Sequence, residues 1–184
     1  RQALSWQRLD LNTWSLALEL LWLAPASVAA NTGDRQALIM EITTRMEFDA
    51  GHRIPSHKSS CKNLHGHRYA IEVTVKGEII DEEQKSDFGM VMDFKDAKEL
   101  IRQTIITPWD HAFIVYEKDH EVINFLATLK DHKTVIFPKV PTAENMALVA
   151  MEKLKKVFDE KFKATIIPIK VRLYETPNNW AESY

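Results

Sequence analysis

The sequence has very little cysteine, no cluster of basic residues and no apolar run long enough to cross a bilayer. Cys61 is the single cysteine among 184 residues, so an intrachain disulfide is excluded. That usage is typical of a reducing compartment and leaves a candidate reactive thiol. The net charge of −2 argues against a nucleic-acid or membrane surface. Residues 16–30 are largely apolar but are interrupted by Glu19 and Pro25 and are too short for a spanning helix. We therefore expect a cytoplasmic protein without nucleic-acid or membrane partners.

The first 40 residues differ in character from the remainder of the chain. Val28-Ala29-Ala30 has the small residues of a signal cleavage site, yet only Arg1 and Arg8 precede it as basic residues. A secretory signal is the less favoured interpretation, and we interpret residues 1–40 as an N-terminal appendage of unknown role. Residues 41–184 are long enough for one domain with its own core. The composition, 45% hydrophobic and 27% charged, is that of a globular domain.

Two histidines open a predicted strand. The run from Arg68 to Lys76 alternates polar and apolar residues, which is the pattern of a half-buried strand. Carried backwards, the alternation puts His65 and His67 on the apolar face, side by side. An H-x-H pair alone is a weak signal, because most such pairs are surface or packing histidines. Burying two imidazoles without partners costs free energy, however, and binding a shared metal ion would give them a partner.

A third histidine lies on the apolar face of an earlier predicted strand. From Thr44 to Ile54 the even positions are mostly apolar and the odd ones mostly polar, and His52 is on the apolar side. This strand, the loop that carries Cys61 and the next strand form a hairpin-like unit that can bring His52 level with the H-x-H pair. Three neutral histidines with an open fourth position are the ligand set of a catalytic zinc, whereas a structural zinc is closed by four protein ligands.

Three further groups could act beside such a metal. Cys61 lies four residues before His65 among polar neighbours, which argues against a buried structural thiol. A thiol near zinc and histidine can lose its proton and act as a base. Asp110-His111 falls in a predicted loop, where a carboxylate can orient an imidazole for acid–base work. Glu175 extends the apolar face of the last predicted strand by one step and needs a partner there, unless the strand has already ended and Glu175 is solvated.

The remaining pattern predicts one domain of the α+β class with the element order β-β-α-(α)-β-α-β. A helix is expected after the N-cap Asp93 and is expected to end at Pro108. A shorter helix is expected within residues 119–129, and a longer one after the N-cap Thr142. Short strands are expected at residues 134–137 and 169–174.

These motifs together resemble those of one known family, the 6-pyruvoyl-tetrahydropterin synthases and 6-carboxytetrahydropterin synthases. Each motif is weak alone, but the set in this order is specific, and it covers roughly residues 42–184. The matching stretches are Phe48-Asp49-Ala50-Gly51-His52-Arg53, Cys61 through Tyr69, Asp87 through Phe94, Asp110-His111, Pro141-Thr142-Ala143-Glu144-Asn145, and Glu175-Thr176-Pro177 with Ala181 and Tyr184.

The resemblance implies a tunnelling fold and a set of site residues. In that fold an antiparallel sheet carries helices on one face, and the subunits pool their sheets into a barrel, usually in a homohexamer built as a dimer of trimers. The implied residues are the zinc ligands His52, His65 and His67, the catalytic cysteine Cys61, the pair Asp110 and His111 lent by a neighbouring subunit, and the pterin anchor Glu175.

The implied activity is that of a zinc-dependent carbon–carbon lyase. Its substrate would be 7,8-dihydroneopterin triphosphate, and its products 6-carboxy-5,6,7,8-tetrahydropterin, acetaldehyde and triphosphate. The spacing C-x3-H-G-H is similar to that of members that make the carboxy product for queuosine (7-deazapurine) biosynthesis. Members that make the pyruvoyl compound typically carry the cysteine further ahead of H-G-H.

Three alternatives stay open. The first is formation of 6-pyruvoyl-tetrahydropterin in the biopterin pathway. The second is a zinc hydrolase, although no glutamate stands near the ligands as it does in H-E-x-x-H. The third is a non-catalytic module that binds zinc or pterin, although binding alone would not require Cys61, Asp110 and His111.

Overall fold

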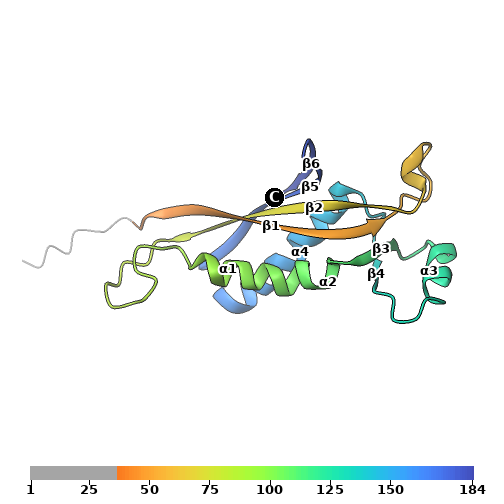
Figure 1. The fold of residues 1–184 in the computed structure, drawn as a ribbon. Helices are drawn as coiled ribbons and strands as arrows, with labels where there is room; N and C mark the ends of the chain where they lie inside the picture. Colours follow the sequence, from red (N-terminus) through yellow and green to blue (C-terminus); the bar gives the residue numbers. More distant parts are fainter. Residues whose placement is uncertain (1–36) are drawn as a thin grey trace, which may run out of the picture. The chain divides into compact units, whose positions relative to one another are not determined.

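Two long antiparallel strands run through the domain and carry the three histidines at one end. β1 spans Ile39–His52 and β2 spans His65–Glu78. They pair along their whole length (Figure 1). His52 lies directly opposite His65. Apolar residues alternate with polar ones in both strands, so one face of the pair is buried. The other face is exposed along much of β1 and only partly exposed along β2. Both predicted strands are confirmed.

Residues 37–184 are the part of the chain that this computed structural model describes. Val28-Ala29-Ala30 and almost all of the predicted appendage lie outside the described residues. β1 begins at Ile39, just before the predicted domain boundary at residue 41. Within residues 37–184, no helix combines the length and the apolar character that crossing a membrane requires.

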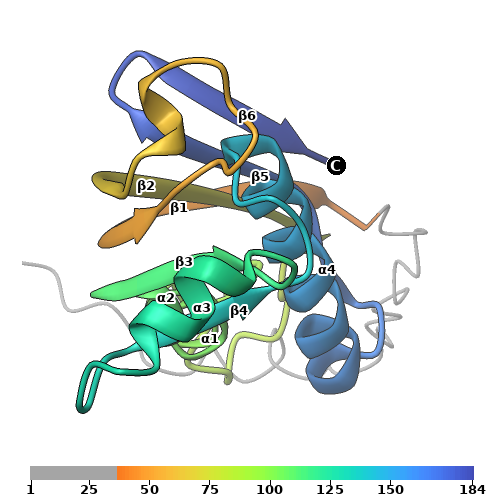
Figure 2. The same cartoon turned by 90° about the vertical axis from the view of Figure 1, so that its right-hand side faces the viewer.

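Six strands form one mixed sheet in the order β4-β3-β1-β2-β5-β6 (Figure 2). β1, β2, β5 and β6 pair antiparallel, whereas β3 joins the outer side of β1 in parallel and β4 joins β3 in parallel. Helix α3 carries the chain back between β3 and β4, which is why these two strands run in the same direction. The α+β class is confirmed, with a mixed sheet in place of a wholly antiparallel one. The added strands are β3 Ala112–Tyr116, β4 Thr134–Phe137, β5 Ile166–Thr176 and β6 Asn179–Ser183.

Neither β3 nor β6 is predicted by the sequence pattern. β3 is a short apolar run without alternation that follows a helix almost at once, and β6 is largely polar. Their strand conformation depends on pairing with β1 and β5, which is a tertiary effect. Both strands lie next to candidate site residues. β3 pairs with Ala50–His52, and β6 pairs with the end of β5, where Glu175 lies.

The first helical segment continues past the proline that was expected to end it. Asp93 caps α1 (Phe94–Ile101) as predicted, accepting the Lys95 N–H at 2.7 Å. A π-helical turn, η3 (Arg102–Ile106), follows and leads directly into α2 (Thr107–Trp109). Pro108 falls in the first turn of α2, where its missing N–H is tolerated. The predicted end at Pro108 is therefore wrong, and Trp109, which follows that proline, is helical and buried.

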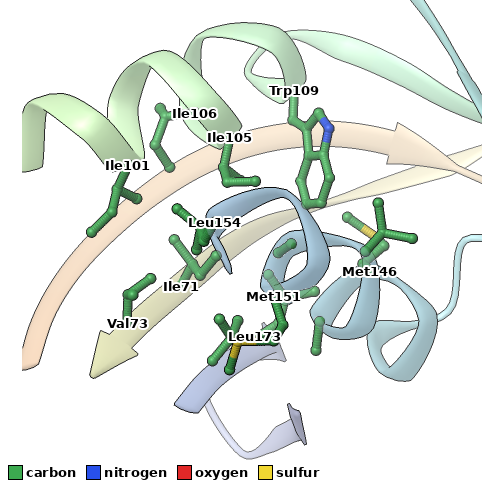
Figure 3. Close-up of a cluster of buried hydrophobic side chains, with 14 of the residues drawn as sticks. Ile71, Val73, Ile101, Ile105, Ile106, Trp109, Met146, Met151, Leu154 and Leu173 are labelled. Carbon is green, nitrogen blue, oxygen red and sulfur yellow. The ribbon is translucent and has the colours of Figure 1, made fainter. Parts of the chain in front are cut away.

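Helices on one face of the sheet bury the core. α4 spans Ala143–Phe162 and is capped by Thr142, which accepts the Asn145 N–H at 3.3 Å, as predicted. The buried sides of α1, η3 and α4 pack against the apolar face of β1, β2 and β5 (Figure 3). The core side chains in that view include Ile71, Val73, Ile101, Ile105, Trp109, Met146, Met151, Leu154 and Leu173.

A buried ion pair ties the end of β1 to α3 (His120–Leu126). Arg53 directly follows His52, and its Nε and Nη2 donate to the two carboxylate oxygens of Asp119, both at 2.6 Å. The Asp119 side chain is 3% exposed and also caps α3 by accepting the Val122 N–H. Hydrogen bonds from Arg53 are the main reason that the pKa of Asp119 lies below its usual 3.8. The pair therefore holds the chain in place next to a candidate metal ligand.

We expect Asp119→Asn to lower the free energy of unfolding by about 1–3 kcal/mol at neutral pH. The substitution removes the negative charge that pairs with Arg53, whereas the asparagine side chain can still cap α3. The lowered pKa means that this stabilisation is present above pH 3.8 and is lost as the pH falls through the lowered value. Urea unfolding of the wild type and of Asp119→Asn, from neutral pH to below the pKa of Asp119, measures the effect. The difference in the free energy of unfolding between the two proteins should shrink in acid. Glu121→Gln, at an exposed carboxylate 3.0 Å from Arg53, is the matched control and should change stability little. A difference that stays constant in acid would contradict the ionic interpretation.

Candidate metal centre

Three histidines converge at the end of the β1–β2 pair. His52 is opposite His65, and His67 is opposite Ala50, whose small side chain leaves room for the rings. The ring centroids are 4.5 Å apart for His52 and His65, 5.2 Å for His52 and His67, and 5.1 Å for His65 and His67. One ring nitrogen of each lies within 4.8 Å of the others. The fold thus brings together the three histidines that the strand alternation groups.

Backbone carbonyls determine which nitrogen of two of these rings carries the proton. His52 Nδ1 lies 2.7 Å from the carbonyl oxygen of Pro141, and His65 Nδ1 lies 2.8 Å from that of Asn63. A carbonyl only accepts, so each Nδ1 donates and each Nε2 keeps its lone pair. Metal-binding histidines are usually supported in this way. Pro141 directly precedes the cap of α4, so the start of that helix orients His52.

Burial lowers the pKa of two of the three histidines. The His52 side chain is 1% exposed and His67 is half-buried. Burial is the main cause that lowers the pKa of both side chains below the usual 6.5. In the described part of the chain, Nε2 of His52 and Nε2 of His67 are buried without a hydrogen-bond partner. Neutral, unpartnered imidazole nitrogens gathered in one place are a donor set that fits Zn²⁺.

Glu175 lies at the edge of the histidine cluster. Its Oε1 is 3.7 Å from His52 Nε2 and 3.9 Å from His67 Nε2, both beyond hydrogen-bond distance. The register of β5 against β6 shifts between Tyr174 and Thr176, so Glu175 occupies a bulge, a feature that redirects side chains near functional sites. The side chain is 29% exposed, which leaves it accessible to a ligand. The carboxylate therefore lies beside the histidines and not free in solvent.

Tyr69 packs against two of the three histidines. Its ring meets those of His52 and His67 edge to face, with centroids 5.9 and 5.6 Å away. The side chain is fully buried, and its hydroxyl has no hydrogen-bond partner among the described residues. Burial is the main cause that raises the pKa of the Tyr69 phenol, and the negative charge of Glu175 raises it further. The phenol therefore stays protonated. The alternation puts Tyr69 on the face of the H-x-H pair, but no sequence pattern assigns it a role.

Asp110 and His111 belong to a second group, which lies away from the three histidines within the subunit. The carboxylates of Asp49 and Asp110 and the ring of His111 have ligand atoms within 4.8 Å of one another. Asp49 points to the face of β1 opposite His52, since neighbours along a strand alternate. His111 Nδ1 lies 2.9 Å from Asp110 Oδ2, and the His111 side chain is 77% exposed. The pair thus faces outward from its own subunit.

Several backbone contacts hold Asp110 in place. Its Oδ1 accepts the Asp49 N–H at 3.0 Å, and the Asp49 carbonyl accepts the His111 N–H at 2.6 Å. Lys133 Nζ donates to the carbonyls of Thr107, the first residue of α2, and of Asp110, which follows that helix. The Asp49 N–H is the main cause that lowers the pKa of Asp110, with His111 adding to it. Asp110 is therefore ionised and orients the His111 ring. The backbone of His111 has a φ of 55°, an uncommon conformation for a side chain of this size.

Cys61 lies on the loop between the two long strands. It is the middle residue of η2 (Ser60–Lys62), and its carbonyl accepts the Ile54 N–H at 2.9 Å, which closes the loop. The side chain is partly exposed. Among the described residues, the metal-binding group contains the three histidines without Cys61. The loop nevertheless joins the strand ends that carry His52 and His65, so Cys61 belongs to the same end of the sheet.

Comparisons with known proteins agree with this geometry. The family model described as 6-pyruvoyl tetrahydropterin synthase matches residues 41–184. A protein of Rickettsia bellii named 6-carboxy-5,6,7,8-tetrahydropterin synthase is 37% identical over 146 residues, which make up 78% of this chain and 99% of the relative. A protein of the same name from Haemophilus influenzae is 35% identical over 147 residues, with 78% and 98% covered.

Solved structures share the fold. The 6-pyruvoyl tetrahydropterin synthase of Caenorhabditis elegans matches with a TM-score of 0.55 at 27% identity, over 80% of this chain and 96% of that one. An uncharacterized protein of Wolinella succinogenes matches with a TM-score of 0.65 over 80% and 99%, and its 21% identity supports the fold alone. At the level of the subunit, the predicted tunnelling fold is confirmed. This chain belongs to the 6-pyruvoyl tetrahydropterin synthase family, a family of enzymes.

Proposed function

We propose that this protein is a zinc-dependent carbon–carbon lyase. It converts 7,8-dihydroneopterin triphosphate into 6-carboxy-5,6,7,8-tetrahydropterin, acetaldehyde and triphosphate in queuosine (7-deazapurine) biosynthesis. The observation that carries the proposal is the cluster of three histidines with Glu175 at its edge. The names of the relatives from Rickettsia bellii and Haemophilus influenzae support the same product.

His52, His65 and His67 would hold the zinc ion. The proposal is supported by the Nε2 atoms of His52 and His67, which are buried and have no hydrogen-bond partner among the described residues. It is also supported by the carbonyls that keep the protons of His52 and His65 on Nδ1. Three protein ligands leave a position open for the substrate. Bound there, zinc supplies a Lewis acid for the hydroxyl oxygens of the substrate side chain.

Glu175 would anchor the pterin ring. A carboxylate can accept two N–H bonds from the amino group and the adjacent ring nitrogen, a bidentate and charge-assisted contact. Its place beside His52 and His67 supports this role, because the ring and its hydroxylated side chain must be held together. The partial exposure of the side chain leaves room for a flat ligand.

Cys61 and His111 would move the protons. The Cys61 thiolate takes a proton from a side-chain carbon of the substrate, and His111, oriented by ionised Asp110, exchanges protons through its free Nε2. The two electrons that reduce the ring come from the side chain, so no outside reductant is needed. Triphosphate leaves, and water enters as the carbon–carbon bond breaks. The carboxyl group stays on the ring, and the two-carbon fragment departs as acetaldehyde.

We further propose a homohexamer, a dimer of trimers with active sites shared between subunits. The outward-facing, exposed His111 supports this arrangement, because its own subunit keeps it away from the three histidines. Within the described range, β3 pairs with β1 only at Ala50–His52, so the rest of the β3-side edge of β1 is open to another strand. The outer edge of β6, the last strand of the sheet, is open in the same way. A cytoplasmic location is part of the proposal and is supported by the lone cysteine.

Formation of 6-pyruvoyl-tetrahydropterin is the second candidate. The family model and the solved structure from Caenorhabditis elegans carry that name. The chemistry is shared up to the loss of triphosphate, and the two candidates differ only in whether the carbon–carbon bond then breaks. The C-x3-H-G-H spacing favours cleavage, since a short tether fixes the approach of the thiolate and proton transfer tolerates little displacement.

The product decides between these two activities. We expect the purified full chain, supplied with 7,8-dihydroneopterin triphosphate, to release acetaldehyde and a compound with the mass of the carboxypterin. Mass spectrometry and an aldehyde assay would measure both. Accumulation of 6-pyruvoyl-tetrahydropterin without acetaldehyde would instead establish the second candidate.

Metal content tests the histidine cluster. We expect about one zinc per chain in the purified protein and loss of most of it in His65→Ala and in His67→Ala, because each removes one of three ligands. Elemental analysis measures this directly. His132→Ala, an exposed histidine on a loop, is the matched control and should keep its zinc. Unchanged zinc in both cluster variants would defeat the assignment.

Mixing of inactive variants tests the shared site. Cys61→Ala and His111→Ala should each fold and lose about 10²–10⁴-fold in turnover, because each removes one proton-transfer group. Hexamers reassembled from the two proteins should regain part of the activity, since some sites then combine intact residues from both chains. The recovered rate, measured after subunit exchange is verified by mass, is the test. No recovery, or a monomer in light scattering, would contradict a shared site.

A further inference from the structure

Tyr69 carries a buried hydroxyl that nothing in residues 37–184 satisfies. It is one of three buried side-chain polar atoms without a partner in that range, and the other two are Nε2 of His52 and Nε2 of His67. A metal ion would account for both nitrogens. It would leave the phenol unexplained, because a protonated phenol is a donor and needs an acceptor.

The ring around this hydroxyl is held in place from several sides. Phe48 stacks on Tyr69 with ring centroids 5.2 Å apart and planes 14° from parallel. The rings of His52 and His67 pack edge to face against it. A ring confined in this way cannot carry its hydroxyl to a distant acceptor, so the acceptor has to be a neighbour that turns toward it.

Glu175 is the acceptor that the sheet places beside Tyr69. β2 and β5 pair antiparallel with Ala70 opposite Tyr174, so the next position along puts Tyr69 and Glu175 side by side on the same face. Glu175 Oε1 lies near two histidine nitrogens without bonding either of them, and its side chain is partly exposed. The carboxylate can therefore turn between the histidines and the phenol.

Packing alone does not call for a tyrosine at this position. Phenylalanine would fill the same space against Phe48 and the histidine rings and would leave no donor unpaired. A buried donor without an acceptor lowers stability, whereas an apolar group of the same shape does not. A hydroxyl kept in such a place is most simply explained by an acceptor that arrives when the site is occupied.

We propose that Tyr69 is the positioning residue for Glu175. When a pterin occupies the site, the Tyr69 hydroxyl donates a hydrogen bond to one oxygen of the Glu175 carboxylate. This bond holds the carboxylate in the plane in which it accepts the N–H groups of the pterin ring. This role rests on the proposed function, in which Glu175 anchors the pterin. It adds a residue that selects the orientation of the anchor without itself touching the substrate.

Tyr69→Phe tests the proposal in the full chain. Neopterin, a pterin without the triphosphate, serves as the probe, and quenching of its fluorescence measures binding to zinc-loaded and metal-free protein. We expect an unchanged zinc content, a thermal midpoint equal to or above that of the wild type, and roughly tenfold weaker neopterin binding. In turnover, KM should rise while kcat changes little. Tyr116→Phe, which removes a hydroxyl on β3, is the matched control and should leave neopterin binding unchanged.

A double-mutant cycle shows whether Tyr69 acts through Glu175. In a Glu175→Gln background the neutral amide is a weaker acceptor, so Tyr69→Phe should weaken binding by less than about threefold. An undiminished tenfold loss there would overturn the proposal, because the hydroxyl would then contact the ligand itself. Wild-type binding in Tyr69→Phe would overturn it as well, and would leave the proposed function intact if the wild type still makes product. A wild-type protein that binds no pterin would refute both.

Discussion

The register of β1 against β2 is the constraint on which the rest of the site depends. With His52 opposite His65 and Ala50 opposite His67, three imidazoles leave one face of the sheet within reach of a single ion. A slip of one residue would turn the side chains of one strand to the other face and disperse the cluster. The long ladder from Ile39 to His52 resists such a slip, because the same alternation also buries Phe48 and Tyr69 against the helices. Core packing and the candidate metal centre are thus two consequences of one pairing.

Neighbouring elements then refine the position of each histidine. The carbonyl of Pro141, at the start of α4, holds the proton of His52 on Nδ1, and the Asn63 carbonyl does the same for His65. Arg53 and Asp119 secure the chain one residue beyond His52. The result is a cluster in which, among residues 37–184, Nε2 of His52 and Nε2 of His67 are buried without a hydrogen-bond partner. It contrasts with the outward-facing pair of ionised Asp110 and exposed His111. One subunit therefore carries two separate groups: the histidine cluster at the end of the β1–β2 pair and the exposed Asp110–His111 pair that follows α2.

Much of this could be predicted from the sequence because it depends on local pattern. Alternation predicts β1 and β2 and puts His52, His65 and His67 on apolar faces, and the caps Asp93 and Thr142 predict where two helices begin. The predicted end at Pro108 failed because a π-helical turn directly precedes α2, and the proline falls in the first turn of α2, where its missing N–H is tolerated. β3 and β6 were not predicted because their strand conformation comes from the partner strand, and five-residue runs carry too little periodicity of their own.

By itself, the sequence determined the ligand types, their faces and the family to which the chain belongs, since these depend on residue identity and on a period of two or 3.6 residues. Only the tertiary structure decided how the strands align. That alignment places Glu175 at a bulge beside His52 and His67 and turns Asp110 and His111 away from them. It also packs Tyr69 against the same histidine rings, where its hydroxyl has no partner among residues 37–184. The physical reason is that hydrogen-bond partners and burial are set by residues far apart in the chain. The carbonyl of Pro141, 89 residues after His52, shows this most directly, because no local pattern links the two.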